Sequence, residues 1–330
     1  MEPDLQDDDW KLIENEKRSK RNRRISWVLI ATMLIWAFFI NGQVVFWELS
    51  GRLGFIPQEE VQYLVENIEY YYLHKDVFQE KEYIESKEKL LQSKWITSKQ
   101  FETFLKGITD MSDDEYSYFY FDSLLDFRSD YSYVVENIDD GFEYSITEER
   151  IGYIHFTEFA EDTSIRFENA IIDFGKEGLN EIVIDLRGNP GGLLFECNDI
   201  ADMLLPETEI ISQIYNDGST YTYYSDELQS EFDKIWIFLD AESASCSEML
   251  ALSLKTNLGE GVEIIGKNTV GKEVTQNVVE SDVFHYALFI VASKWGVKDQ
   301  TVKDLNKILD AYDGVTLSNY EDYYHFVLDE

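Results

Sequence analysis

The 330-residue sequence is poor in cysteine and histidine, with only Cys197, Cys246 and four histidines. Two cysteines are too few for a disulfide scaffold or an all-cysteine zinc site, and no paired Cys/His spacing is present. Basic residues are also scarce, because 28 Lys and Arg stand against 65 Asp and Glu and give a formal net charge of −37. Such a chain repels phosphate, which excludes nucleic-acid binding driven by charge.

The chain is nevertheless not a disordered acidic polymer. Hydrophobic residues make up 44% of the sequence and aromatic residues 15%, which is enough to bury a core. The length allows one large domain or two modest ones. Residues 1–24 contain equal numbers of acidic and basic residues. The remainder of the chain therefore carries the whole negative excess.

An uncharged apolar segment follows the neutral N-terminal part. Six bases cluster at the end of residues 1–24, and residues 25–46 then run without a charge. A helix of this length, at about 1.5 Å per residue, crosses the roughly 30 Å hydrocarbon core of a bilayer. We therefore predict a transmembrane signal anchor at residues 25–47, with a cytoplasmic basic tail before it and an extracytoplasmic domain after it. A cleaved signal peptide and a soluble core helix are the alternatives.

The segment after the anchor predicts a small helical subdomain and a connector. Residues 48–110 begin with a short linker and then show helical periodicity with many charges. Ser98 is the expected N-cap of the last helix and Gly107 the expected stop. Residues 111–150 are acidic and rich in tyrosine, and they predict a connector with one or two short strands.

From residue 151 onward, strand-like apolar runs alternate with helical stretches. This alternation predicts a layered α/β core at residues 151–300, followed by a helical tail at 301–330. Strands are expected at residues 151–156, 181–186, 235–239, 262–266 and 285–292. Helices are expected at about residues 163–177, 196–205 and 246–257.

Three segments of this core follow predicted strands, where α/β proteins tend to place their sites. Residues 185–192, DLRGNPGG, form a Gly/Pro turn that can present backbone N–H groups to an anion. Residues 242–248, ESASCSE, place hydroxyl groups at the start of a helix. In residues 266–276, burial of Lys272 would lower its pKa and make the neutral amine available as a base. Taken singly, the three are also compatible with an ordinary turn, an N-cap and a surface lysine.

Together the three segments resemble the S41 family of C-terminal-processing (tail-specific) serine peptidases, as a membrane-anchored variant. The family's Asp-Leu-Arg-x-Asn-Pro-Gly-Gly motif matches residues 185–192 at every fixed position. Its Ser/Thr-Ala-Ser-Ala-Ser-Glu motif matches residues 243–248, except that Cys246 replaces an alanine. Its Thr-Phe-Gly-Lys-Gly-x-x-Gln motif corresponds to residues 269–276, where Glu273 replaces the glycine after the lysine.

The resemblance implies a role for each candidate site residue. Ser245 would be the nucleophile, Lys272 the base that takes its proton, and Gln276 the group that orients the amine. The oxyanion would be held by backbone N–H groups, one from Cys246 and one from Gly191 or Gly192. No metal ion and no cofactor are implied.

The resemblance also implies a fold and a function. The fold would be a crotonase-like (ClpP/crotonase) layered core with an N-terminal helical subdomain, preceded by one transmembrane helix. The protein would be an extracytoplasmic endopeptidase, anchored by a single pass in the cell membrane, that cleaves exported or membrane-attached polypeptides. Residues 111–150 are too few for the PDZ domain that is usual in the family.

The sequence leaves two alternatives open. A catalytically silent, S41-like peptide-binding protein is the other functional reading, because an inward-pointing carboxylate of Glu273 would raise the pKa of Lys272. A disulfide between Cys197 and Cys246 is the second open point, since Cys197 follows the glycine turn and Cys246 follows the nucleophile.

Overall fold

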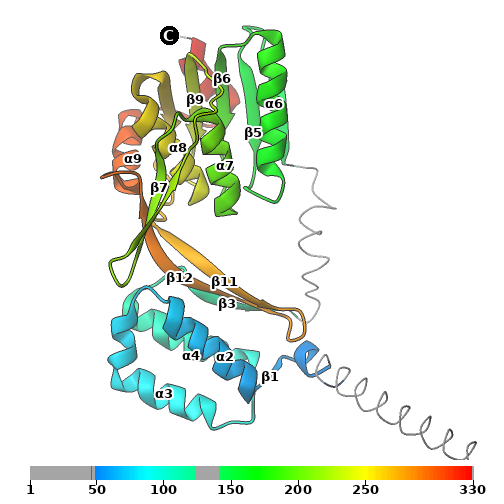
Figure 1. Ribbon diagram of the computed structural model, residues 1–330, viewed down its shortest axis with the longest axis vertical. Coiled ribbons are helices and arrows are strands. Elements are labelled where there is room, and N and C mark those ends of the chain that lie inside the picture. Colours follow the sequence, from blue (N-terminus) through cyan, green and yellow to red (C-terminus); the bar gives the residue numbers. More distant parts are fainter. Residues whose placement is uncertain (1–45, 47–48, 123–140, 329–330) are drawn as a thin grey trace, which may run out of the picture.

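The computed structural model describes Phe46 and residues 49–122 and 141–328 (Figure 1). The transmembrane anchor predicted at residues 25–47 lies outside this range, apart from Phe46. Over the described part of the chain, no helix combines the length and the apolar character that a membrane span requires.

A mixed α/β core is built on a five-stranded sheet in the order β10–β9–β6–β5–β4, in which only β4 and β5 pair antiparallel. The central strands are rich in Ile and Val and are buried on both faces, as a covered parallel sheet requires. The strand bounds are β4 Phe142–Ile146, β5 Gly152–Phe156, β6 Glu181–Asp185, β9 Lys234–Leu239 and β10 Val262–Gly266.

Helices cover both faces of this sheet (Figure 1). One apolar cluster joins one face of the sheet to α6, α7, α8 and α9, and a second cluster joins the opposite face to α10. The predicted alternation of strands and helices is confirmed in this region. The bounds are α6 Thr163–Glu177, α7 Leu194–Leu204, α8 Cys246–Leu258, α9 Val302–Leu309 and α10 Tyr320–Leu328, with short 3-10 turns η2 Gly259–Gly261 and η3 Asp310–Tyr312.

A second, antiparallel sheet in the order β11–β12–β7–β8 leaves the core as a long ribbon (Figure 1). Strand β12 pairs with β7 near its end and with β3 near its beginning, so it connects distant parts of the chain. Of these strands, β12 was predicted near its observed position, and β3 is one of the short strands predicted for the connector. Strands β7, β8 and β11 were not predicted. The bounds are β3 Tyr118–Phe121, β7 Glu209–Tyr215, β8 Thr220–Tyr224, β11 Val274–Ser281 and β12 Tyr286–Gly296.

The N-terminal region is helical, as expected, and packs on the ribbon formed by β11 and β12 (Figure 1). Its apolar residues form one buried cluster with apolar residues of these two strands. A short antiparallel pair, β1 with β2, holds the start of α2 next to the start of α4. The bounds are β1 Phe55–Pro57, α2 Gln58–Tyr71, η1 Lys75–Gln79, α3 Lys81–Leu91, β2 Trp95–Thr97 and α4 Ser98–Ser112.

Both ends predicted for α4 are wrong. The N-cap is Thr97 rather than Ser98, because Thr97 and Gln100 form a reciprocal capping box. The Gln100 side chain accepts the Thr97 backbone N–H at 2.8 Å, and Thr97 Oγ1 accepts the Gln100 N–H at 3.2 Å. The helix also continues through Gly107 to Ser112. Its apolar face stays buried beyond the glycine, and this burial outweighs a cost of about 1 kcal/mol for glycine in a helix.

Candidate active site

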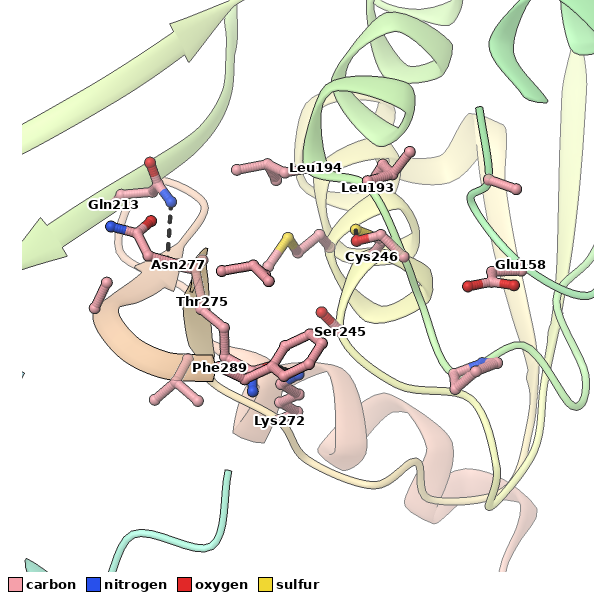
Figure 2. A pocket seen from close by; sticks show the side chains of 18 of the residues that line it. Glu158, Leu193, Leu194, Gln213, Ser245, Cys246, Lys272, Thr275, Asn277 and Phe289 are labelled. Carbon is pink, nitrogen blue, oxygen red and sulfur yellow. Dashed lines mark hydrogen bonds between the residues drawn. The ribbon is translucent and has the colours of Figure 1, made fainter. Parts of the chain in front are cut away.

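A cavity of about 710 Å³ lies between the α/β core and the antiparallel ribbon. It is lined by the turn after β6, the start of α8, the segment before β11, and side chains of β7, β11 and β12. Figure 2 shows Ser245 and Lys272 projecting into this space, with Phe289 beside them. The predicted nucleophile, base and orienting residue therefore line one cavity, although they come from two separate segments.

Ser245 occupies a sharp turn between β9 and α8. Its backbone φ is 53° and ψ is −114°, a conformation that costs free energy in any residue other than glycine. Gly191 packs directly against it, since a Cβ atom at Gly191 would lie 2.8 Å from the Ser245 Cβ. The serine is partly exposed, whereas its neighbours Ala244 and Cys246 are buried. The turn therefore presents the Ser245 hydroxyl to the cavity at the N-terminus of a helix, where the dipole favours negative charge.

The glycine turn supplies backbone N–H groups next to this serine. The Gly191 N–H donates to Asn189 Oδ1 at 2.9 Å, so it is already engaged. On either side of Gly192, the Phe159 N–H donates to the Gly191 carbonyl and the Leu193 N–H donates to the Phe159 carbonyl. Neither bond uses the N–H of Gly192, which lines the cavity. Of the two glycines predicted for an oxyanion hole, the geometry favours Gly192.

Cys246 provides the other predicted N–H group as the first residue of α8. The first N–H groups of a helix have no intrahelical acceptor, so this group is available to a ligand. The Cys246 thiol donates to the Gly192 carbonyl at 3.3 Å, which ties the helix start to the glycine turn. The Cys197 thiol donates to the Cys246 carbonyl at 3.5 Å. Both cysteines are buried free thiols, so the structure contains no disulfide between these two described residues.

Lys272 lies between β10 and β11, and its Nζ donates to Gln276 Oε1. The Trp295 indole N–H donates to the Lys272 carbonyl at 2.8 Å and fixes its backbone from the ribbon side. Burial lowers the pKa of Lys272 below its ordinary value, while the nearby Glu248 and Cys246 act in the opposite direction. The surroundings therefore shift the equilibrium towards the neutral amine, which is the form a base requires.

Glu248 holds the nucleophile and lysine segments together, a role the sequence did not predict. This buried carboxylate accepts the Ser245 N–H at 2.6 Å, the Thr269 hydroxyl at 2.6 Å and the Gly271 N–H at 2.7 Å. It also accepts the Lys272 N–H at 3.1 Å. The pKa of Glu248 is raised by burial, and these hydrogen bonds reduce the rise without cancelling it. An acid three residues after an N-cap serine is a capping-box pattern, and this was the available signal.

Glu273 is directed away from Lys272, the predicted base. Its carboxylate lies 4.0 Å from Lys294 Nζ and 3.8 Å from Lys303 Nζ, on partly exposed surface. It is not among the groups that shift the pKa of Lys272. The catalytically silent alternative depended on a Glu273 carboxylate that points towards Lys272. In the structure this carboxylate instead lies near Lys294 and Lys303.

Residues 150–301 match the model of peptidase family S41. This region, called the S41 region below, is similar to that family and makes up a little under half of the chain. All the predicted site residues lie within the S41 region, whereas the N-terminal helical region lies before it.

Curated relatives show a similarity of the same kind. The chain is 28% identical over 130 residues to the carboxyl-terminal-processing protease of Synechocystis sp. and 29% identical over 150 residues to the carboxy-terminal processing protease CtpA of Bacillus subtilis. It is 32% identical over 134 residues to a probable CtpA-like serine protease of Staphylococcus aureus. The matches cover 39%, 45% and 40% of this chain but only 30%, 32% and 27% of the relatives.

Solved structures share the fold over a longer part of the chain. The photosystem II D1 C-terminal processing protease aligns with a TM-score of 0.52 at 14% identity, covering 72% of this chain and 87% of that one. A lipoprotein from Streptococcus agalactiae aligns with a TM-score of 0.55 at 15% identity, covering 74% and 88%. Because the identities are only 14% and 15%, these alignments show a shared fold and nothing more. The shared fold extends beyond the S41 region, since the alignments cover 72% and 74% of this chain.

Proposed function

We propose that the chain is a serine endopeptidase that cleaves polypeptides through an acyl-enzyme formed on Ser245. The observation that carries the proposal is the cavity in which a strained Ser245 at a helix start faces the same space as a partly buried Lys272 hydrogen-bonded to Gln276. A serine and a lysine of lowered pKa are the two groups that acyl transfer without a histidine requires.

Each step uses groups already in place. The Ser245 Oγ attacks the peptide carbonyl carbon while the neutral Lys272 amine accepts its proton. The carbonyl oxygen becomes an oxyanion, which the N–H groups of Cys246 and Gly192 stabilise. The lysine then returns the proton to the leaving amine as the peptide bond breaks. A water molecule then attacks the ester carbonyl carbon while the same amine takes its proton. The amine returns this proton to the Ser245 Oγ as the ester bond breaks, which releases the acid product and regenerates the serine.

The substrates and the location are part of the proposal. Six bases followed by an uncharged apolar segment support a single membrane anchor at residues 25–47, with the peptidase core outside the cytoplasm. Exported or membrane-attached polypeptides would then be the substrates within reach. Relatives whose names describe carboxyl-terminal processing support cleavage near the C-terminal end of such a chain.

A serine-directed activity probe tests the nucleophile without knowledge of the substrate. A fluorophosphonate is expected to label the wild-type chain covalently and to leave Ser245→Ala unlabelled, as read by mass spectrometry of the intact protein. Labelling of both proteins at the same rate would contradict the proposal. Absence of labelling in both would instead support the catalytically silent peptide-binding alternative.

Peptide cleavage is expected to increase with pH. Protonated Lys272 cannot accept the serine proton, so the rate rises as the amine loses its proton. Burial lowers the pKa of Lys272 from 10.5, and the rise should therefore occur at lower pH than for an exposed lysine. The measurement is kcat/KM for a peptide substrate from about pH 5 to 9. A flat profile over this range would exclude Lys272 as the base.

A further inference from the structure

The amide of Gln276 is held at both ends, and one end is held from outside the S41 region. Its Oε1 accepts from Lys272, whereas its Nε2 donates to the backbone carbonyl of Tyr116 at 2.6 Å. Tyr116 lies between α4 and β3, 160 residues before Gln276 in the chain. The N-terminal helical region therefore contacts the group that orients the proposed base.

This contact fixes which way the Gln276 amide faces. A backbone carbonyl can only accept a hydrogen bond, so the Tyr116 carbonyl requires the NH₂ end of the amide. The oxygen end must then face Lys272, where it accepts a hydrogen bond from the amine and orients its nitrogen. Without an acceptor at Tyr116, the amide could rotate and present its NH₂ end to the lysine. This NH₂ group would oppose the N–H groups of the protonated amine and would occupy the lone pair of the neutral amine, which a base needs.

The Tyr116 side chain adds a second contact with the lysine. Its ring centroid lies 5.5 Å from Lys272 Nζ, so the ring packs beside the amine. The ring also covers one side of the amine and limits its access to water. The charged or titratable groups that influence Lys272 from the core side are Glu248 and Cys246 of α8, since Glu273 pairs with lysines elsewhere.

The backbone at Tyr116 is itself anchored in the helical region. Asp114 Oδ1 accepts the N–H of Tyr116 at 2.8 Å and the N–H of Ser117 at 3.1 Å. Asp114 Oδ2 accepts the hydroxyl of Tyr72, which is fully buried at the end of α2. The buried Ser117 hydroxyl accepts the Val291 N–H of β12 at 2.8 Å, which pins the segment to the ribbon. The Tyr116 carbonyl is therefore held from both the helical region and the ribbon.

We propose that Tyr116 is a positioning residue for the catalytic lysine, supplied by the N-terminal helical region and held in place by Asp114. Its carbonyl sets the orientation of the Gln276 amide, and its ring shields the Lys272 amine from water. The inference rests on the proposed Ser245–Lys272 chemistry and adds to it a residue outside the S41 region. The helical region thereby completes the active site rather than only covering the ribbon.

Variants of Asp114 test the anchor. In the full chain, Asp114→Ala is expected to lower kcat for peptide cleavage by about tenfold or more with little change in KM, because a small displacement of a catalytic group has effects of this order. Asp114→Asn keeps an acceptor oxygen for the two N–H groups and is expected to restore most of kcat. Asp110→Ala removes an exposed acid of α4 that pairs with Lys106 and serves as the control with wild-type kcat.

Equal kcat values for folded Asp114→Ala and wild type would overturn the inference. Thermal unfolding shows whether the variant is folded, and if it is not, Tyr116→Ala decides. The readout for Tyr116→Ala is the pKa of Lys272, measured by competitive labelling with acetic anhydride and mass spectrometry. In Tyr116→Ala the pKa of Lys272 is expected to rise towards the ordinary lysine value. Tyr116→Phe keeps the ring and is expected to keep the lowered pKa. An unchanged pKa in Tyr116→Ala overturns the inference.

This second readout does not depend on peptide cleavage. If the wild-type chain cleaves no peptide and binds no serine probe, the proposed peptidase function fails. The labelling profile of Lys272 still reports whether Tyr116 shields it. If the wild type cleaves and the Asp114 and Tyr116 variants match it in both assays, only the positioning role fails.

Discussion

Replacing Ser245 by alanine is expected to lower kcat/KM for peptide cleavage by about 10⁴-fold or more, because the covalent route to the acyl-enzyme is lost. The substitution removes one oxygen atom from a partly exposed side chain and leaves the capping carboxylate of Glu248 with its backbone partners. The fold should therefore persist. The measurement is the rate of peptide hydrolysis for wild type and variant, with thermal unfolding recorded in parallel.

Ser247→Ala is the matched control within the same motif. The buried Ser247 hydroxyl donates to the Asn189 carbonyl at 2.9 Å and does not line the cavity. Its removal is expected to lower the free energy of unfolding by about 1 kcal/mol while cleavage continues. A loss of cleavage in Ser247→Ala together with full activity in Ser245→Ala would show that the motif had been aligned in the wrong register.

The core of the fold was predictable because its strands are short apolar runs separated by helical stretches. Strands β6, β9 and β10 are buried on both faces, and such strands consist almost entirely of apolar residues. The three chemical motifs follow β6, β9 and β10 directly, so their positions at one edge of the sheet could be expected from the sequence. Their assembly around a single cavity follows from the parallel pairing of these strands.

The antiparallel ribbon was harder to predict for a physical reason. Strands β7, β8 and β11 carry many Thr, Gln, Asn and Tyr residues, and their pattern does not separate a strand from a polar loop. Their stability comes from pairing with each other and with β12, which the local sequence does not encode. The ribbon nevertheless supplies one wall of the cavity.

Two features of the site depend on single contacts with no sequence signature. The choice between Gly191 and Gly192 depends on the Asn189 side chain, which engages the Gly191 N–H. The contribution of Tyr116 is mainly a backbone carbonyl, which every residue type possesses. Neither contact could be derived from composition or spacing.

Replacing Lys272 by methionine is expected to lower kcat by about 10³-fold or more, because the amine proposed to take the serine proton is lost. Methionine preserves the apolar stem in this partly buried position and removes an amine whose desolvation is costly, so the free energy of unfolding should not fall. Arginine at the same position separates the two possible roles of the lysine, since its guanidinium keeps the positive charge but does not deprotonate. Lys272→Arg should therefore be as inactive as Lys272→Met, whereas the exposed Lys267→Met in the same loop should cleave at the wild-type rate. Wild-type cleavage by the arginine variant would mean that Lys272 acts through its charge and that another group removes the proton.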